Sequence, residues 1–346
     1  MNRRIPTTRS DAPAYLARYQ ERKAQATPEP SVTEKDEAPY VARARERAAV
    51  RAGRGVRAED APPGGVSVEY ATETVSPREL VPPPWFHDKR MLGSIDVRLI
   101  RHGQTQSYSA DGGLTPLGRW QGHRKGQDLA RGVTPGMTIR FPHAPTARAR
   151  ETALALREGL LQGLARYHIE ANVEEPHPIE GFKNFQVWCD GRARDPTQAF
   201  VQYATLLEDY ERHKSGDRPG WLVEMERFWS IQAAGGDPIA HWLRMPMQYF
   251  EPAALCVRRF WKAIVGEVRR GPQNLRLFVA THSGPIRAVA TAALGHDPGE
   301  PTNLEDVRVR VHPDLEHAIV TYRERGLEIE IPSCTAPPWG VATDKR

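Results

Sequence analysis

The stretch DVRLIRHGQTQSY, residues 96–108, decides the fold. Together with the two residues before it, it begins as a short apolar run, SIDVRLI, which predicts a strand with few polar positions. Such strands are typical of parallel sheets that helices cover on both faces. The run ends abruptly in Arg101, His102 and Gly103. The strand therefore carries a cation and an imidazole to its tip, with a glycine that lets the backbone turn or approach a ligand.

A second strand ends in the same way. The apolar run LRLFVA, residues 275–280, leads into Thr281, His282, Ser283 and Gly284. The carboxyl ends of parallel strands lie at one edge of a sheet, which is where α/β proteins bind their ligands. We therefore expect the two histidines to come together at one site.

A third segment is expected to join them. PTARARETA, residues 145–153, follows another predicted strand and opens a helix, which puts Arg148 near the helix N-terminus. Arginine binds phosphate through two parallel hydrogen bonds, and helix N-termini favour anions. Two arginines and two histidines around one cleft predict a phosphoryl site, because an imidazole can attack phosphorus and hold the group covalently.

The rest of the chain alternates between strand and helix patterns. The predicted strands are 94–100, 137–145, 168–175, 275–284, 307–313, 317–325 and 327–333, and the predicted helices are 114–133, 146–167, 196–214, 251–270 and 285–295. This order indicates an α/β fold, a three-layer α/β/α sandwich with a mostly parallel central sheet. A helical cap is expected to be inserted at about residues 182–252, where the alternation stops.

Two helices are expected to turn apolar side chains toward the sheet. In the helix at 114–133, Thr115 can cap the N-terminus and Pro116 suits the first turn. Its inner face is predicted to hold Leu117, Trp120, Leu129 and Val133. The helix at 146–167 offers apolar positions that include Leu154, Leu156, Leu160 and Leu161.

The chain is expected to divide into a polar arm, a folded domain and a tail. Residues 1–85 are rich in Ala, Arg, Glu and Pro without a broad apolar stripe, which predicts a disordered arm. Within 79–89 the three prolines of ELVPPPWFHDK predict an extended lead-in. Residues 86–335 are predicted to form the domain, and 336–346 a flexible tail.

Composition excludes several classes of protein. No run of about 18 apolar residues exists, and the basic start lacks the apolar core of a secretion signal, so neither a membrane span nor export is expected. The three cysteines, Cys189, Cys256 and Cys334, form no disulfide or zinc spacing, which fits a reducing cytoplasm. The net charge of +5 comes from arginines scattered among glutamates, so nucleic acid is not the expected partner.

Four motifs occur together in one order: LIRHGQT (99–105), LTPLGRWQG (114–122), PTARARETA (145–153) and THSGPIRA (281–288). In this order and approximate spacing the chain resembles the histidine phosphatase superfamily, in the branch of the phosphoglycerate mutases and many small phosphatases. The resemblance covers roughly residues 94–190 and 255–325. It implies a cytoplasmic, metal-independent phosphomonoester hydrolase that acts on a small phosphorylated substrate without a cofactor.

The resemblance also assigns roles to residues. His102 would be the nucleophile that becomes phosphohistidine, and His282 the second pocket histidine. Arg101 and Arg148 would bind the phosphoryl oxygens, with Gly103 and Ser283 beside them. Positioning and electrostatic stabilisation are what such a cluster supplies to the transferring phosphoryl group.

A general acid must protonate the leaving oxygen, and the resemblance places a glutamate after the third strand. In EEPHPIEGFKNFQVW, residues 174–188, we choose Glu180, since Glu174 and Glu175 are expected to lie on the strand. The sequence departs from the usual pattern after Glu180, where Asn184, Phe185 and Gln186 stand. It departs again six residues after the nucleophile, where Tyr108 replaces a common asparagine. Further candidates for substrate contacts are Gln104, which replaces a frequent glutamate, Ser107 and Lys183.

Several alternatives stay open at this stage. The same motifs fit phosphoryl transfer of the cofactor-dependent phosphoglycerate mutase type. They also fit a non-catalytic protein of the same fold that binds a phosphorylated ligand, and the polar arm could bind a partner. A metal site of His102, His143 and His282 lacks carboxylates at a recognisable spacing, so no metal is expected. A serine hydrolase is not expected, because the G-x-S-x-G elbow is missing around Ser283. The oligomeric state is left open.

Overall fold

Two parallel strands form the centre of the sheet and end side by side. β1 (Ile95–Arg101) pairs with β8 (Leu275–Thr281) from Asp96 opposite Arg276 to Arg101 opposite Thr281. Because both strands run in the same direction and end in register, the residues that follow them leave the sheet next to each other. The computed structural model that shows this describes residues 93–106, 111–189, 191–213, 218–333 and 339. They all belong to one compact unit, Pro82–Arg346.

The central sheet is mixed. Its order is β11-β10-β9-β1-β8-β2-β4, with β3 beside β8 and β5 beside β3. The strands on the β8 side pair in parallel, and those on the β9 side are antiparallel. Besides β1 and β8, the bounds are β2 (Thr138–Arg140), β3 (Pro142–His143), β4 (Asn172–Val173), β5 (His177–Pro178), β9 (Asp306–Val311), β10 (His317–Tyr322) and β11 (Arg325–Glu330).

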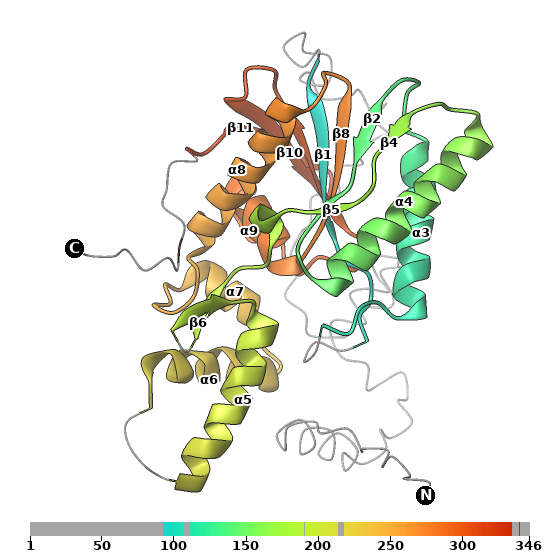
Figure 1. Cartoon of the computed structure of the whole chain (residues 1–346). Helices are drawn as coiled ribbons and strands as arrows, with labels where there is room; N and C mark the ends of the chain where they lie inside the picture. Colours follow the sequence, from blue (N-terminus) through green and yellow to red (C-terminus); the bar gives the residue numbers. More distant parts are fainter. Residues whose placement is uncertain (1–92, 107–110, 190, 214–217, 334–338, 340–346) are drawn as a thin grey trace, which may run out of the picture. The chain divides into compact units, whose positions relative to one another are not determined.

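Helices cover both faces of this sheet, so the predicted three-layer α/β/α class is confirmed. α3 (Pro116–Ala130) and α4 (Ala147–Tyr167) lie on one face, and α8 (Ala253–Arg270) and α9 (Ser283–Leu294) on the other (Figure 1). As predicted, the Thr115 hydroxyl caps α3 by accepting a hydrogen bond from the Gly118 N–H at 3.0 Å. Gly295, with a positive φ of 74°, ends α9.

The predicted inner faces of α3 and α4 are wrong in part. Leu117 and Trp120 are 49% and 62% exposed, and Leu154 and Leu161 are also exposed. On α3 the buried positions are instead three glycines spaced by four residues, together with Leu129 and Ala130: Gly118, Gly122 and Gly126. A stripe without side chains lets the two helix backbones approach closely, so α3 meets α4 through glycine rather than through its large apolar residues.

The close approach of the α3 and α4 backbones leads us to predict that a side chain added at their contact destabilises the protein. A Cβ at Gly159 of α4 would lie 1.9 Å from the backbone oxygen of His123 on α3, so Gly159→Ala must push the helices apart. We expect a loss of about 1–3 kcal/mol in the free energy of unfolding, more than the gain in helix propensity. Gly266→Ala on α8 is the matched control, since a Cβ there meets only the Arg270 side chain, at 3.5 Å. Urea unfolding measures the free energy of unfolding of both variants. Equal stability would contradict the close contact between α3 and α4.

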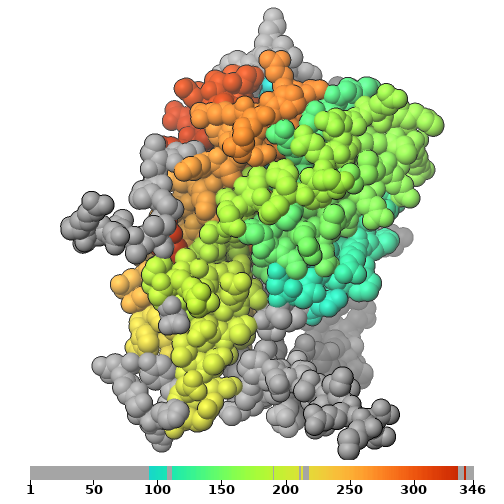
Figure 2. Space-filling model, in the orientation of Figure 1, coloured from blue at the N-terminus to red at the C-terminus, as the bar shows by residue number. Residues whose placement is uncertain are grey.

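A helical segment lies between the third parallel strand and α8. Its elements are η5 (Glu180–Phe182), β6 (Val187–Cys189), β7 (Arg192–Arg194), α5 (Pro196–His213), α6 (Gly220–Ala233) and α7 (Pro238–Arg244). Figure 1 shows α5 and α6 below the sheet, and Figure 2 shows the surface of this part of the chain, in yellow, at the lower end of the same view. We call residues 182–252 the cap, the range predicted from the sequence.

Aromatic side chains hold the cap together and join it to the sheet domain. The Phe185 and Trp242 rings stack with centroids 4.3 Å apart, and Phe228 packs against Phe250. A Cβ at Gly284, in the first turn of α9, would lie 2.8 Å from the Phe185 ring. The base of the cap therefore packs directly on the turn that carries His282. Outside the described residues lie the predicted arm, the whole lead-in, the predicted tail apart from Trp339, and three single residues: Ser107, Tyr108 and Cys334.

Candidate active site

His102 leaves the end of β1 and is held by its neighbours. Its backbone N–H donates to the Thr281 carbonyl at 2.9 Å, and its Nδ1 lies 2.8 Å from the Gly103 carbonyl oxygen. A carbonyl can only accept, so Nδ1 carries the proton and Nε2 carries the lone pair. The side chain is 3% exposed, and burial, with Arg148 and Arg101 nearby, lowers the pKa of His102 to about 3. The imidazole is therefore neutral at ordinary pH and has a lone pair to donate.

His282 lies beside it at the end of β8. The two ring centroids are 5.4 Å apart and the ring planes are at 71°. Burial holds the pKa of His282 well below its usual value, with Arg148 and His102 adding to the effect. Its Nε2 lies 3.3 Å from the Thr146 hydroxyl, and its Nδ1 is buried without a hydrogen-bond partner.

Thr152 of α4 links Gly103 to Arg148. Its hydroxyl accepts a hydrogen bond from the Gly103 N–H at 3.0 Å and donates to the Arg148 carbonyl at 2.7 Å. A Cβ at Gly103 would lie 2.6 Å from the Gly118 oxygen, so the turn after His102 needs glycine here. Through these contacts α4 and the first strand end are fixed relative to each other.

Arg148 is almost fully buried, and its outer nitrogens are held by carboxylates. Its Nη1 donates to Asp111 at 3.2 Å, and its Nη2 lies 3.6 Å from an Asp195 oxygen and 3.5 Å from the Thr197 hydroxyl. Asp195 and Thr197 belong to the cap, whereas Asp111 follows the first motif. The Arg148 Nε is buried with no hydrogen-bond partner. Arg150, two residues on, is exposed.

Arg101, the last residue of β1, is held in a similar way. Its Nη1 forms an ion pair with Glu300, 2.9 Å away, and donates to the Pro301 carbonyl. Glu300 also accepts a hydrogen bond from the Ser283 hydroxyl at 2.7 Å. The Arg101 Nε, like that of Arg148, is buried without a partner. Each predicted phosphate-binding arginine thus has its outer edge fixed by a carboxylate and one buried N–H donor unused.

Other predicted site residues lie elsewhere. Glu180 is on η5 with its side chain 77% exposed, and its carboxylate lies 3.7 Å from the Lys183 Nζ. Gln104 is exposed, and its side-chain oxygen accepts a hydrogen bond from the Thr115 hydroxyl. The structure therefore brings together His102, His282, Arg101, Arg148, Gly103 and Ser283, whereas Glu180, Lys183 and Gln104 contact one another or α3.

Three carboxylates of the site are missing from the sequence prediction. Asp111, Asp195 and Glu300 all contact the pocket arginines, but none lies in the four motifs. The only signal in the sequence is local: Asp195 precedes Pro196 in the pattern of a helix N-cap. Nothing in the spacing of Asp111 or Glu300 relates them to Arg148 or Arg101.

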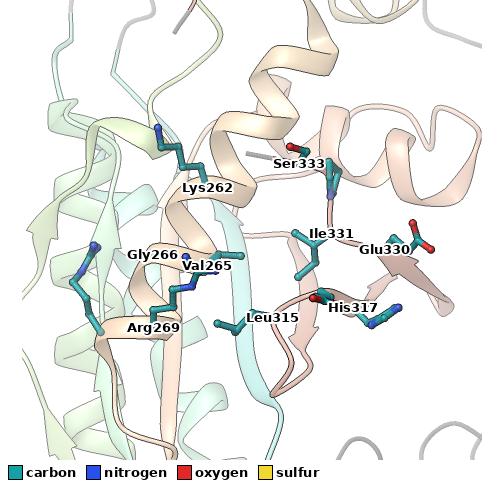
Figure 3. A pocket seen from close by; sticks show the side chains of 12 residues that line it. Lys262, Val265, Gly266, Arg269, Leu315, His317, Glu330, Ile331 and Ser333 are labelled. Carbon is teal, nitrogen blue, oxygen red and sulfur yellow. The ribbon is translucent and has the colours of Figure 1, made fainter. Parts of the chain in front are cut away.

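A separate cavity of roughly 730 Å³ lies between α8 and the β10–β11 hairpin. Lys262 and Arg269 line one side, and His317 and Glu330 line the other (Figure 3). By the strand pairing it is at the end of the sheet where β1 begins, opposite to His102.

Within the described ranges no group of three or more His, Cys, Asp or Glu is placed to hold a metal ion. No described helix is long and apolar enough to cross a membrane.

The buried neutral histidine predicts a pH-dependent stability. The ordinary pKa of His102 is 6.5 and the folded value is about 3, so below pH 6.5 the unfolded chain binds more protons. The stabilisation is complete above pH 6.5 and is lost as the pH falls toward 3, by up to about 1.4 kcal/mol per pH unit. Urea unfolding of wild type and His102→Gln between pH 7 and 5 tests this. We expect a shallower slope in the variant; identical slopes would contradict it.

Comparison with known proteins gives similarities in structure but not in sequence. No family model and no curated protein matches the chain. It is similar to a mycobacterial glucosyl-3-phosphoglycerate phosphatase (16% identity, 68% of this chain and 97% of that one, TM-score 0.39). It is similar to a putative alpha-ribazole-5'-P phosphatase from Escherichia coli (13%, 70% and 97%, TM-score 0.35). The phosphoserine phosphatase of Entamoeba histolytica in complex with phosphoserine is a third (16%, 70% and 98%, TM-score 0.34).

Proposed function

We propose that this chain hydrolyses phosphomonoesters through a phosphohistidine formed on His102. The observation that carries the proposal is the pair of buried guanidinium groups, Arg101 and Arg148, each with an Nε that has no hydrogen-bond partner. A buried donor without a partner is costly, and a phosphoryl group would supply acceptors for both. The two neutral histidines, His102 and His282, lie next to each other, which is the pairing expected for a nucleophile and a group that binds the transferring oxygens.

The reaction uses the protonation state that the site imposes. The Nε2 lone pair of His102 attacks phosphorus, and the ester bond to the leaving oxygen breaks. Charge on the phosphoryl oxygens is stabilised by the guanidiniums and by His282. Water then breaks the phosphorus–nitrogen bond and regenerates the neutral imidazole. Apart from the substrate and water, every group that takes part in this reaction is a side chain of the protein. We therefore propose a reaction that needs neither a metal nor a cofactor.

Hydrolysis of a panel of phosphomonoesters tests the proposal. Wild-type protein is incubated with 4-nitrophenyl phosphate and with small metabolite phosphates, with and without a chelator, and released phosphate is measured. We expect turnover that the chelator leaves unchanged. Isomerisation of phosphoglycerate that depends on the bisphosphate would support the mutase alternative. Phosphate binding without any turnover would support the non-catalytic alternative.

A further inference from the structure

The proposed hydrolysis needs a group that protonates the leaving oxygen, and the inference about that group rests on the proposed function. Glu180 is the sequence prediction, but its side chain is 77% exposed and is paired with Lys183. General acids act within hydrogen-bond distance of the reacting oxygen. The carboxylates that do reach the pocket arginines, among the described residues, are Asp111, Glu300 and Asp195.

Both oxygens of Asp111 and of Glu300 are engaged by neighbouring groups. Asp111 accepts from the Ala147 N–H at 2.5 Å through Oδ2, and from Arg148 through Oδ1. The Glu300 Oε1 accepts a hydrogen bond from Ser283 and pairs with Arg101, and its Oε2 forms an ion pair with the Arg287 guanidinium, 3.6 Å away. These two carboxylates are committed to holding the arginines and the start of α4.

Asp195 differs from Asp111 and Glu300 because one of its carboxylate oxygens has no hydrogen-bond partner. Its Oδ1 accepts from the Thr197 N–H at 2.9 Å and faces Arg148, but its Oδ2 is buried and has no hydrogen-bond partner. The side chain is 14% exposed and stands at the N-terminus of α5, on the cap side of Arg148. A buried carboxylate oxygen without a hydrogen-bond partner is unfavourable, and the leaving oxygen of a bound substrate would supply that partner.

We propose that Asp195, supplied by the cap, is the general acid and base of the reaction. Its Oδ2–H donates a proton to the leaving oxygen while the ester bond breaks and His102 takes the phosphoryl group. The product alcohol leaves, and Asp195 is then a carboxylate. In the second step Asp195 takes a proton from water, the water oxygen bonds to phosphorus, and the phosphorus–nitrogen bond breaks. Phosphate leaves, and His102 and Asp195 return to their starting forms.

Arg148 connects the acid to the substrate. Its guanidinium contacts both Asp111 and Asp195. A phosphate that binds the unpartnered Arg148 Nε therefore lies close to Asp195. Because Asp195 lies on the cap, the position of the acid depends on how the cap is docked.

The test compares two esters of similar shape that differ in their need for an acid. 4-Nitrophenolate leaves readily without a proton, whereas phenolate is a poorer leaving group. We expect Asp195→Asn to lower kcat/KM for phenyl phosphate at least about tenfold more than for 4-nitrophenyl phosphate. Asparagine keeps the N-cap bond to the Thr197 N–H, so α5 is preserved. A structural defect would lower both rates equally.

Glu208→Gln is the matched control, since it removes one exposed carboxylate from the same helix of the cap. It is expected to leave the ratio of the two rates at the wild-type value. Two outcomes would overturn the assignment: an unchanged ratio in Asp195→Asn, or the selective loss of phenyl phosphate turnover in Glu180→Gln instead. Wild-type protein that hydrolyses neither ester contradicts the proposed function itself, and this inference with it.

Discussion

His102→Ala is expected to lower kcat/KM for 4-nitrophenyl phosphate by about 10⁴-fold or more, the order of loss seen when a covalent nucleophile is removed. The physical reason is that the covalent intermediate needs the ring nitrogen of His102 that attacks phosphorus. His102 carries a lone pair on Nε2 because its Nδ1–H is bound to the Gly103 carbonyl, and its lowered pKa keeps that lone pair free of a proton. Steady-state assays of wild type and His102→Ala at saturating and subsaturating 4-nitrophenyl phosphate measure this loss of kcat/KM.

His317→Gln is the control for His102→Ala, because His317 lies at the opposite end of the sheet and pairs with Asp314. We expect its turnover to match wild type. A His102→Ala protein that folds normally and retains more than about a tenth of the activity would contradict the assignment of the nucleophile. Binding of inorganic phosphate to that variant shows whether the rest of the pocket is intact.

Arg148→Ala is expected to be the second most damaging change, with a loss of about 10²–10³ in kcat/KM. The guanidinium supplies an unpartnered buried Nε to the phosphate and balances two carboxylates. Without it Asp111 and Asp195 face the pocket as uncompensated negative charges, so phosphate is repelled as well as unbound. We expect KM, and the inhibition constant of inorganic phosphate, to rise along with the fall in kcat.

Arg150→Ala provides the matched control for Arg148→Ala. The motif ARARET presents both arginines two residues apart, but the structure buries Arg148 and exposes Arg150. Arg150→Ala is therefore expected to keep wild-type kinetics and phosphate inhibition. The reverse pattern, with Arg150→Ala impaired and Arg148→Ala unaffected, would show that the phosphate lies on the other side of α4.

The parts of the site that could be predicted from sequence are those fixed by strand direction. Apolar runs before Arg101-His102 and before Thr281-His282 predict parallel strands, and parallel strands in register deliver their next residues to one place. The helix start that carries Arg148 follows from the change from a strand pattern to a helical pattern at residues 145–153. These inferences need only local periodicity and the topology of an α/β sheet.

What could not be predicted depends on contacts between distant loops. Asp195 and Glu300 reach the arginines because the cap and the turn after α9 fold over the strand ends, which no local pattern reveals. The inner face of α3 was mispredicted for a related reason. Hydropathy places Trp120 in the core, but the glycine stripe at Gly122 and Gly126 is buried instead, since it permits a closer contact with α4.

The central claim is that His102 becomes phosphorylated. The most direct measurement is to mix the protein with ³²P-labelled substrate, quench within milliseconds, and recover the protein-bound phosphate under alkaline and acidic conditions. We predict a label that is stable to alkali, lost in acid, mapped to the peptide containing His102, and absent from His102→Ala. A wild-type protein that turns over substrate without any acid-labile label, or with the label on another residue, would contradict the account.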